Sequence, residues 1–123
     1  MFSELAVAHI HSRQHAGALA DATHVGTAGS PGGGPYCVLY LYLEGDNVLK
    51  AGYDTHGCPT SVAAAGVLCS LIIGRKLEDC LSMTGDELAR IIGPIPEGKD
   101  DCPKRTIVAL NSLTRSPGEH IDA

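Results

Sequence analysis

The sequence of 123 residues predicts a single α+β domain, a two-layer sandwich of a small antiparallel sheet packed against helices. A hairpin pattern lies near the middle of the chain, helical patterns stand on both sides of it, and no internal repeat is present. The length suffices for one hydrophobic core and is too short for two. We therefore expect one domain over residues 1–123.

The first third of the chain predicts a helix and then a long loop. Apolar residues line one side of a helix from Phe2 to Gln14, with Ser3 as its N-cap. Residues Gly17 to Gly34 are rich in Ala, Gly, Thr and Ser, which is typical of irregular structure. A loop of this length in so small a domain is usually functional or mobile.

The hairpin is the strongest local pattern. Tyr36 to Leu43 is rich in Tyr, Leu and Val, and it ends at the turn sequence Glu44-Gly45-Asp46-Asn47. The returning strand is predicted over Val48 to Asp54. Alternation along the first strand places Cys37, Leu39 and Leu41 on one face.

Helices are predicted for the rest of the chain. Thr60 to Ile73 carries apolar residues at helical spacing and suits an almost wholly buried helix that ends at Gly74. Two further helices are expected, a short one at Lys76 to Leu81 and one opened by the capping-box spacing Thr84 to Glu87 that runs through Ile92. A loop at Gly93 to Gly98, a helix at Lys104 to Leu113 and a frayed polar tail after Thr114 complete the chain.

Charge and hydropathy exclude two classes of partner. Nine basic against fourteen acidic residues give a net charge of −5, the wrong sign for binding a phosphate backbone. The longest nearly apolar run, Val62 to Ile73, is about half the roughly 20 residues that a membrane-spanning helix needs. The N-terminus lacks the layout of a signal peptide. We therefore expect a soluble cytoplasmic protein without nucleic-acid or membrane partners.

The five cysteines favour free thiols over a disulfide framework. Their number is odd, their spacing is irregular and no CxxC pair occurs. Cys69 and Cys80 lie on the apolar faces of predicted helices and are expected to pack in the core. The histidines at positions 9, 11 and 15 are expected to be surface groups or helix contacts.

Cys58 and Cys102 share one local setting, because each ends a loop and is followed by proline at the expected start of a helix. A thiol at a helix N-terminus faces free backbone N–H groups and the positive end of the helix dipole, which favour the thiolate. His56 and Asp101 add an imidazole and a carboxylate nearby. Together these residues provide three or four ligands for zinc or iron.

Several segments resemble the U-type family of iron–sulfur cluster assembly scaffolds, which includes IscU, SufU and the N-terminal domain of NifU. The resemblance rests mainly on Ala51 to Ala65 and Ile73 to Asp79. It extends to His9 to Gly17 and to Lys99 to Cys102. It implies a small α+β fold of the SufE/NifU-like kind, in which cysteine ligands meet at one exposed edge.

The family resemblance also implies a function without enzymatic turnover. A scaffold takes sulfur from a cysteine desulfurase, binds iron, holds a [2Fe–2S] cluster or a zinc ion, and passes sulfur or cluster to apo iron–sulfur proteins. On this reading Cys58 and Cys102 are ligands, and Asp101 with either Cys37 or His56 completes the shell. The segment Ile95 to Lys99 stands where such scaffolds contact a chaperone.

The first ligand motif of the family is altered in this sequence. An ungapped alignment puts Gly33 at the expected cysteine and Pro35 at the expected aspartate, whereas a shifted alignment places Cys37 there. Asp101 also replaces a histidine. Two alternatives to a cluster scaffold therefore stay open: a degenerate homologue that binds no cluster and acts as an adaptor or regulator, and a zinc-dependent sulfur acceptor like SufU.

Overall fold

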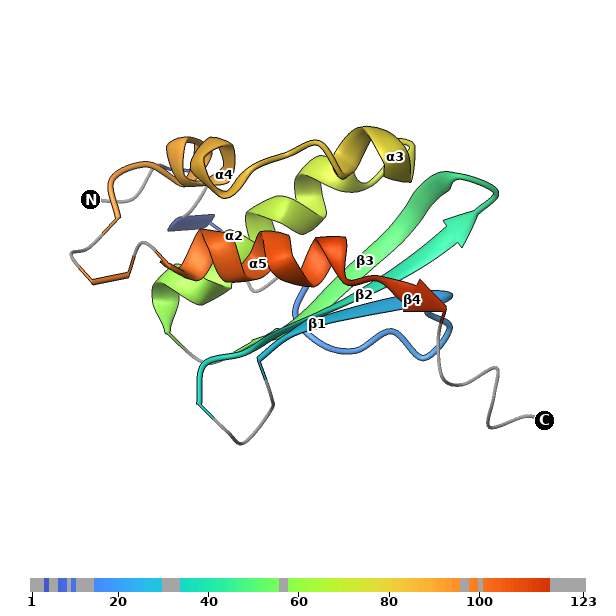
Figure 1. Ribbon diagram of the computed structural model, residues 1–123, viewed down its shortest axis with the longest axis horizontal. Coiled ribbons are helices and arrows are strands. Elements are labelled where there is room, and N and C mark those ends of the chain that lie inside the picture. The colour runs from blue at the N-terminus through green and yellow to red at the C-terminus, as the bar shows by residue number, and fades with distance from the viewer. Residues whose placement is uncertain are drawn as a thin grey trace.

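The computed structural model describes residues 4, 7–8, 10, 15–29, 34–55, 58–95, 98–99 and 101–115. It confirms the predicted two-layer α+β class. Figure 1 shows the helices together over one face of an antiparallel sheet whose strand order is β3-β2-β1-β4. Most of the N-terminal helix expected from Phe2 to Gln14, including its N-cap Ser3, lies outside the described residues.

The predicted hairpin is confirmed as β2 (Cys37–Glu44) and β3 (Asn47–Thr55). The two strands pair in antiparallel register from Cys37 with Thr55 to Glu44 with Asn47. As expected from alternation, Cys37, Leu39 and Leu41 share the helix-covered face, where each is at most 1% exposed.

The expected loop over Gly17 to Gly34 is wrong in part, because it contains β1 (His24–Ala28). This strand pairs with β2 on one side and with the two-residue β4 (Thr114–Arg115) on the other, so Arg115, the first residue of the tail predicted to fray, is part of the sheet. Because β1 lies in a segment rich in Ala, Gly, Thr and Ser, the sequence did not predict it as a strand. A Cβ atom added at Gly26 would lie 2.0 Å from the carbonyl oxygen of Ala109, so a glycine is required where a helix approaches the strand.

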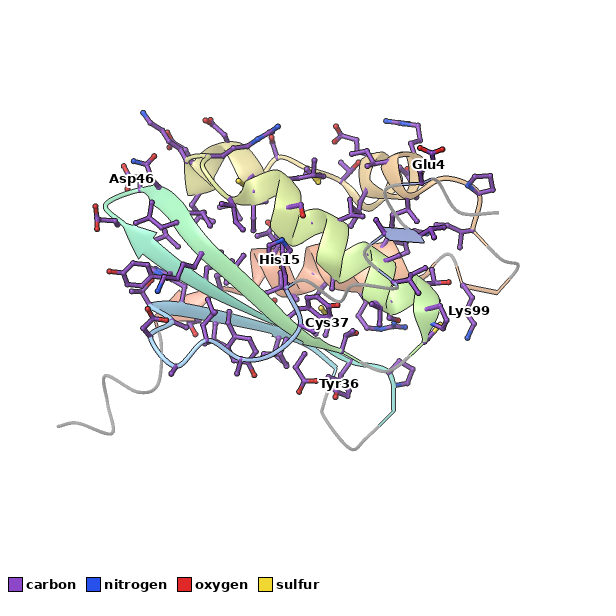
Figure 2. All side chains as sticks on the ribbon, turned by 180° about the vertical axis from the view of Figure 1, so that it is seen from behind. Glu4, His15, Tyr36, Cys37, Asp46 and Lys99 are labelled. Carbon is purple, nitrogen blue, oxygen red and sulfur yellow. The ribbon has the colours of Figure 1, made fainter. Side chains whose placement is uncertain are left out.

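The chain enters the sheet by crossing the face opposite the helices (Figures 1 and 2). At the edge of β3, Gly17 N–H donates to the carbonyl of Tyr53 at 2.7 Å. On the open face, Lys50 Nζ lies 2.7 Å from the carboxylate of Asp21. The chain therefore passes from the edge of β3 at Gly17 across part of the open face at Asp21 before β1 begins.

The four described helices follow β3 in the order α2 (Pro59–Ile72), α3 (Leu77–Cys80), α4 (Gly85–Ile92) and α5 (Asp101–Asn111). The predicted capping box at the start of α4 is present, since the hydroxyl of Thr84 accepts from Glu87 N–H and the carboxylate of Glu87 accepts from Thr84 N–H. Helix α2 ends at Ile72, and Gly74 follows with φ of +89°.

The start of α5 differs from the prediction. The helix begins at Asp101 and not at Lys104, so Cys102 lies inside the first turn and Pro103 is the third helical residue. Pro103 has no N–H to donate, and none is needed within the first turn of a helix.

The core lies between the sheet and helices α2 and α5. Helix α2 packs mainly on β3, α5 packs on β1 and β2, and α4 packs on the two helices. Cys69 and Cys80 are 0% and 2% exposed, as predicted for core residues. Across the part of the chain that the structure describes, no helix combines the length and apolar character needed to cross a membrane.

Candidate functional site

A small pocket lies where the N-terminal ends of α2 and α5 meet. It has a volume of about 190 Å³ and is called here the two-thiol pocket. Its lining residues are Pro35, Cys58, Ser61, Gly98, Lys99, Asp101, Cys102 and Arg105. The structure thus brings Cys58 and Cys102 to one site, although they are far apart in the sequence.

Cys58 is the N-cap of α2, and Pro59 is the first helical residue, as the sequence predicts. The thiol is half-buried. Burial acts to raise the pKa of Cys58, but hydrogen bonds from the backbone N–H groups of Ser61 and Thr60, together with the charge of Lys99, outweigh it. The pKa of Cys58 is therefore lowered, and its thiolate is favoured.

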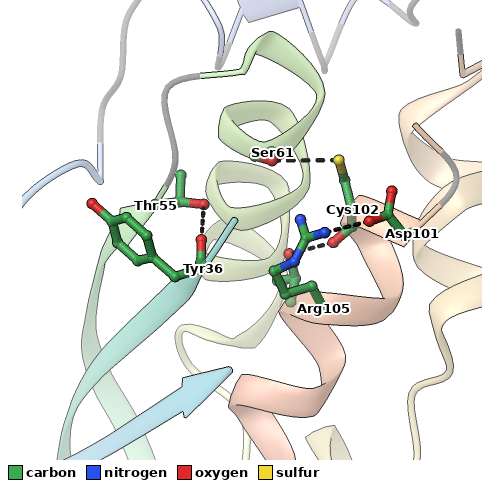
Figure 3. Close-up of polar contacts among 7 residues, drawn as sticks. Tyr36, Thr55, Ser61, Asp101, Cys102 and Arg105 are labelled. Carbon is green, nitrogen blue, oxygen red and sulfur yellow. Dashed lines mark hydrogen bonds and ion pairs between the residues drawn. The ribbon is translucent and has the colours of Figure 1, made fainter. Parts of the chain in front are cut away.

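Cys102 reaches the pocket from the first turn of α5 and is 4% exposed. The hydroxyl of Ser61 donates a hydrogen bond to Cys102 Sγ at 3.4 Å (Figure 3). One turn further along the helix, the hydroxyl of Thr106 donates to the carbonyl of Cys102 at 3.1 Å. Ser61 contacts both pocket thiols, since its backbone N–H donates a hydrogen bond to Cys58.

Asp101 lies at the rim of the pocket, with its side chain 61% exposed. Its carboxylate pairs with the guanidinium of Arg105 one turn later in α5, and the Arg105 side chain is only 16% exposed. Lys99 adds a second cation to the wall. The carboxylate that the sequence offers as a metal ligand is thus engaged in an ion pair in this conformation.

Cys37 is buried in the core and does not belong to the wall of the two-thiol pocket. The residue is 1% exposed, and burial raises the pKa of its thiol to about 11, although hydrogen bonds with Thr106 and Thr55 and the charge of Arg105 act in the opposite direction. Figure 2 shows Cys37 inside the molecule, away from Lys99 at the pocket rim. Whether this thiol binds metal stays a prediction.

The donors in the pocket are two thiols and one paired carboxylate, which favours a soft metal over Mg²⁺ or Ca²⁺. Among the described residues, no group of three or more His, Cys, Asp and Glu side chains is arranged to hold a metal ion. His56 lies outside the described residues, and so do His9 and His11. In the segment expected to contact a chaperone, Pro96 and Glu97 also lie outside them.

Three polar or charged pocket residues were not predicted as site residues from the sequence: Ser61, Lys99 and Arg105. The ion pair between Arg105 and Asp101 could be predicted from the sequence, because an acidic and a basic residue four positions apart in a helix are neighbours. Ser61 follows Cys58 by three positions, but its contact with Cys102 depends on how α2 and α5 pack. That contact has no signal in the sequence.

A larger pocket of about 400 Å³ lies elsewhere, next to the turn between β2 and β3. Its wall contains His24, Leu43, Gly45, Asp46, Leu77, Glu78 and Leu81. It contains no cysteine, and only one histidine and two carboxylates accompany three leucines. Because thiolate chemistry is what the sequence predicts, the smaller two-thiol pocket is the candidate site.

Comparison with known proteins identifies the family of this chain. A family model for the NifU-like N-terminal domain matches residues 1–114. The chain is similar to an iron–sulfur cluster assembly scaffold protein IscU of Archaeoglobus fulgidus, with 26% identity over 110 residues that cover 89% of this chain and 72% of that protein. It is also similar to the nitrogen fixation protein NifU of Azotobacter chroococcum, with 31% identity over 82% of this chain and 33% of that protein.

Solved structures share the fold. A putative iron–sulfur cluster assembly scaffold protein for the SUF system from Fervidobacterium islandicum aligns with a TM-score of 0.69 at 21% identity, covering 89% of this chain and 93% of that one. The N-terminal part of a NifU-like protein from Brucella abortus aligns with a TM-score of 0.58 at 20% identity over 89% of this chain and 87% of that one.

Proposed function

Since the chain belongs to the family of NifU-like N-terminal domains, we propose that it is a scaffold for iron–sulfur cluster assembly that binds its cargo at the two-thiol pocket. The observation that carries this proposal is the meeting of Cys58 and Cys102 at the ends of α2 and α5. The names of the IscU and NifU relatives support the same function.

The two thiols differ in a way that suits stepwise loading. Cys58 is the more accessible sulfur and has a lowered pKa, so its thiolate is available to attack the outer sulfur of a donor persulfide. The sulfur–sulfur bond of the donor then breaks, the outer sulfur stays on Cys58, and the donor thiolate leaves. A cysteine desulfurase is the proposed sulfur donor, and apo iron–sulfur proteins are the proposed recipients.

Iron and sulfide are the cargo of this site and not a resident cofactor. Cys58 and Cys102 supply two thiolates for a [2Fe–2S] cluster or a zinc ion, and Asp101 supplies a carboxylate once it leaves Arg105. Either Cys37 or His56 would complete the set, and Cys37 would have to leave its buried position. We propose that the protein is loaded and unloaded stoichiometrically and is not an enzyme.

The proposal is tested by metal analysis and an ultraviolet–visible spectrum of the protein purified without oxygen. We expect iron, sulfide and the absorbance of a sulfide-bridged iron centre. Cys58→Ser and Cys102→Ser should each lose this absorbance, because serine is a poor ligand for these metals. Cys69→Ala is the matched control: it removes a core thiol and should keep the metal.

Other outcomes would identify the alternatives. Stoichiometric zinc without colour, lost from Cys58→Ser, would replace the cluster scaffold by a zinc-dependent sulfur acceptor. Neither iron nor zinc in the unaltered protein, even after incubation with ferrous iron and sulfide, would contradict metal binding and favour an adaptor or regulator.

A further inference from the structure

We propose that Ser61 is a positioning residue whose hydroxyl, through a direct hydrogen bond, orients the sulfur of Cys102 and lowers the electron donation of that sulfur to bound iron. The proposal rests on the scaffold function above and adds a residue to it. The residue neither ligates nor reacts. It holds one sulfur toward the pocket and changes how readily that sulfur donates electron density to bound iron.

The geometry separates two roles within one residue. Ser61 lies in the first turn of α2 and is 3% exposed. Its backbone N–H contacts Cys58, which caps the same helix, and its hydroxyl donates to Cys102 Sγ on the neighbouring helix at 3.4 Å (Figure 3). Ser61 therefore contacts both thiols: its backbone N–H contacts Cys58, and its hydroxyl contacts Cys102.

A hydrogen bond to a ligand sulfur has a defined electronic effect. It stabilises negative charge on the sulfur, so the more negative, reduced state of a bound cluster gains more than the oxidised state. The reduction potential of the cluster is then higher with the hydrogen bond than without it. For the same reason, charge transfer from the sulfur to the metal requires more energy.

Burial strengthens the hydrogen bond between Ser61 and Cys102. The Ser61 hydroxyl is enclosed between α2 and α5, where a hydrogen bond is little weakened by competing water. Ser61→Ala removes the hydroxyl and leaves the backbone N–H to Cys58 in place. Alanine also suits a helix at least as well as serine, so α2 should form normally in the variant.

The experiment compares the unaltered protein with Ser61→Ala, Ser61→Thr and Ser70→Ala. Ser70 is the control, because its hydroxyl lies on the same helix and contacts His15 Nε2 at 3.1 Å, outside the two-thiol pocket. Each protein is reconstituted without oxygen for measurement of the cluster potential, and a second sample is loaded with Co²⁺ alone for its sulfur-to-cobalt absorption band. Thermal unfolding followed by circular dichroism checks that every variant folds.

We expect Ser61→Ala to lower the cluster potential and to move the cobalt band to longer wavelength. Ser61→Thr keeps a hydroxyl and should bring both readouts back toward those of the unaltered protein, whereas Ser70→Ala should change neither. A purely structural role for Ser61 would alter the melting temperature without these spectroscopic shifts.

Two results would overturn the inference. If Ser61→Ala loads normally with unchanged potential and an unchanged band, Ser61 does not tune the site, and the scaffold proposal stands without it. If the unaltered protein binds neither iron nor Co²⁺, the scaffold proposal fails and this inference falls with it.

Discussion

Each cysteine of the chain has a different environment, and the environment decides what each thiol can do. Cys58 is half-buried with a lowered pKa, whereas Cys37 is enclosed and has a pKa raised to about 11. A thiolate is needed both for attack on sulfur and for metal binding. Cys58 therefore meets this requirement more readily than Cys37.

Substitution of Cys37 by serine tests whether this buried thiol is a displaced first ligand. We expect Cys37→Ser to keep the metal content of the unaltered protein, because Cys37 is not part of the pocket wall. Stability should fall by about 1 kcal/mol, since a polar hydroxyl replaces a buried thiol. Metal analysis and urea unfolding measure the two effects. Lost metal with unchanged stability would instead show that Cys37 binds the cargo.

At the scale of elements, the packing of α5 against β1 positions Cys102. The glycine at position 26 lets the backbone of α5 approach the strand at Ala109, which lies in the same helix as Cys102. A larger residue in β1 would push the helix away from the sheet. The pocket thus depends on a contact that lies outside its own wall.

Substitution of Gly26 tests this dependence. In Gly26→Ala the added Cβ would meet the Ala109 carbonyl at 2.0 Å, so the helix or the strand must shift. We expect a loss of stability on the order of 1–3 kcal/mol in urea unfolding, together with weaker metal binding. Thr27→Ala is the control, because Thr27 is exposed on the same strand. Equal stability of the two variants would contradict the close approach.

At the scale of the whole molecule, the segment before β1 ties both layers together. His15 Nε2 lies 3.1 Å from Ser70 Oγ on α2, and Asp21 pairs with Lys50 on the open face of the sheet. Burial lowers the pKa of His15 below its ordinary value of 6.5. The segment therefore contacts α2 through His15, whose neutral form is favoured in the folded protein.

Folding should accordingly become less favourable in mild acid. As pH falls from above 6.5 through the lower pKa of folded His15, the unfolded chain binds more protons than the folded protein, so the free energy of unfolding decreases. We expect His15→Gln to lose less stability than the unaltered protein between pH 7.5 and about pH 5.5. Urea unfolding at both pH values measures this difference. Identical pH dependence in the two proteins would exclude His15 as the responsible group.

The sequence by itself determined the elements whose signals are local. The hairpin of β2 and β3, the capping box of α4 and Cys58 as the N-cap of α2 all depend on neighbouring residues in the chain, and each was predicted correctly. Strand alternation also placed Cys37 on the helix-covered face. The resemblance to U-type scaffolds, which rests on such local segments, indicated the family that the matched family model shows.

Only the tertiary structure decided the features that join distant parts of the chain. Strand β1 has a weak local signal and forms because β2 and β4 pair with it on both sides. Helix packing brings the Ser61 hydroxyl to Cys102 and encloses Cys37 in the core. Local patterns fix which way a side chain points along its own helix or strand, whereas the distance between two such side chains depends on how closely those elements pack.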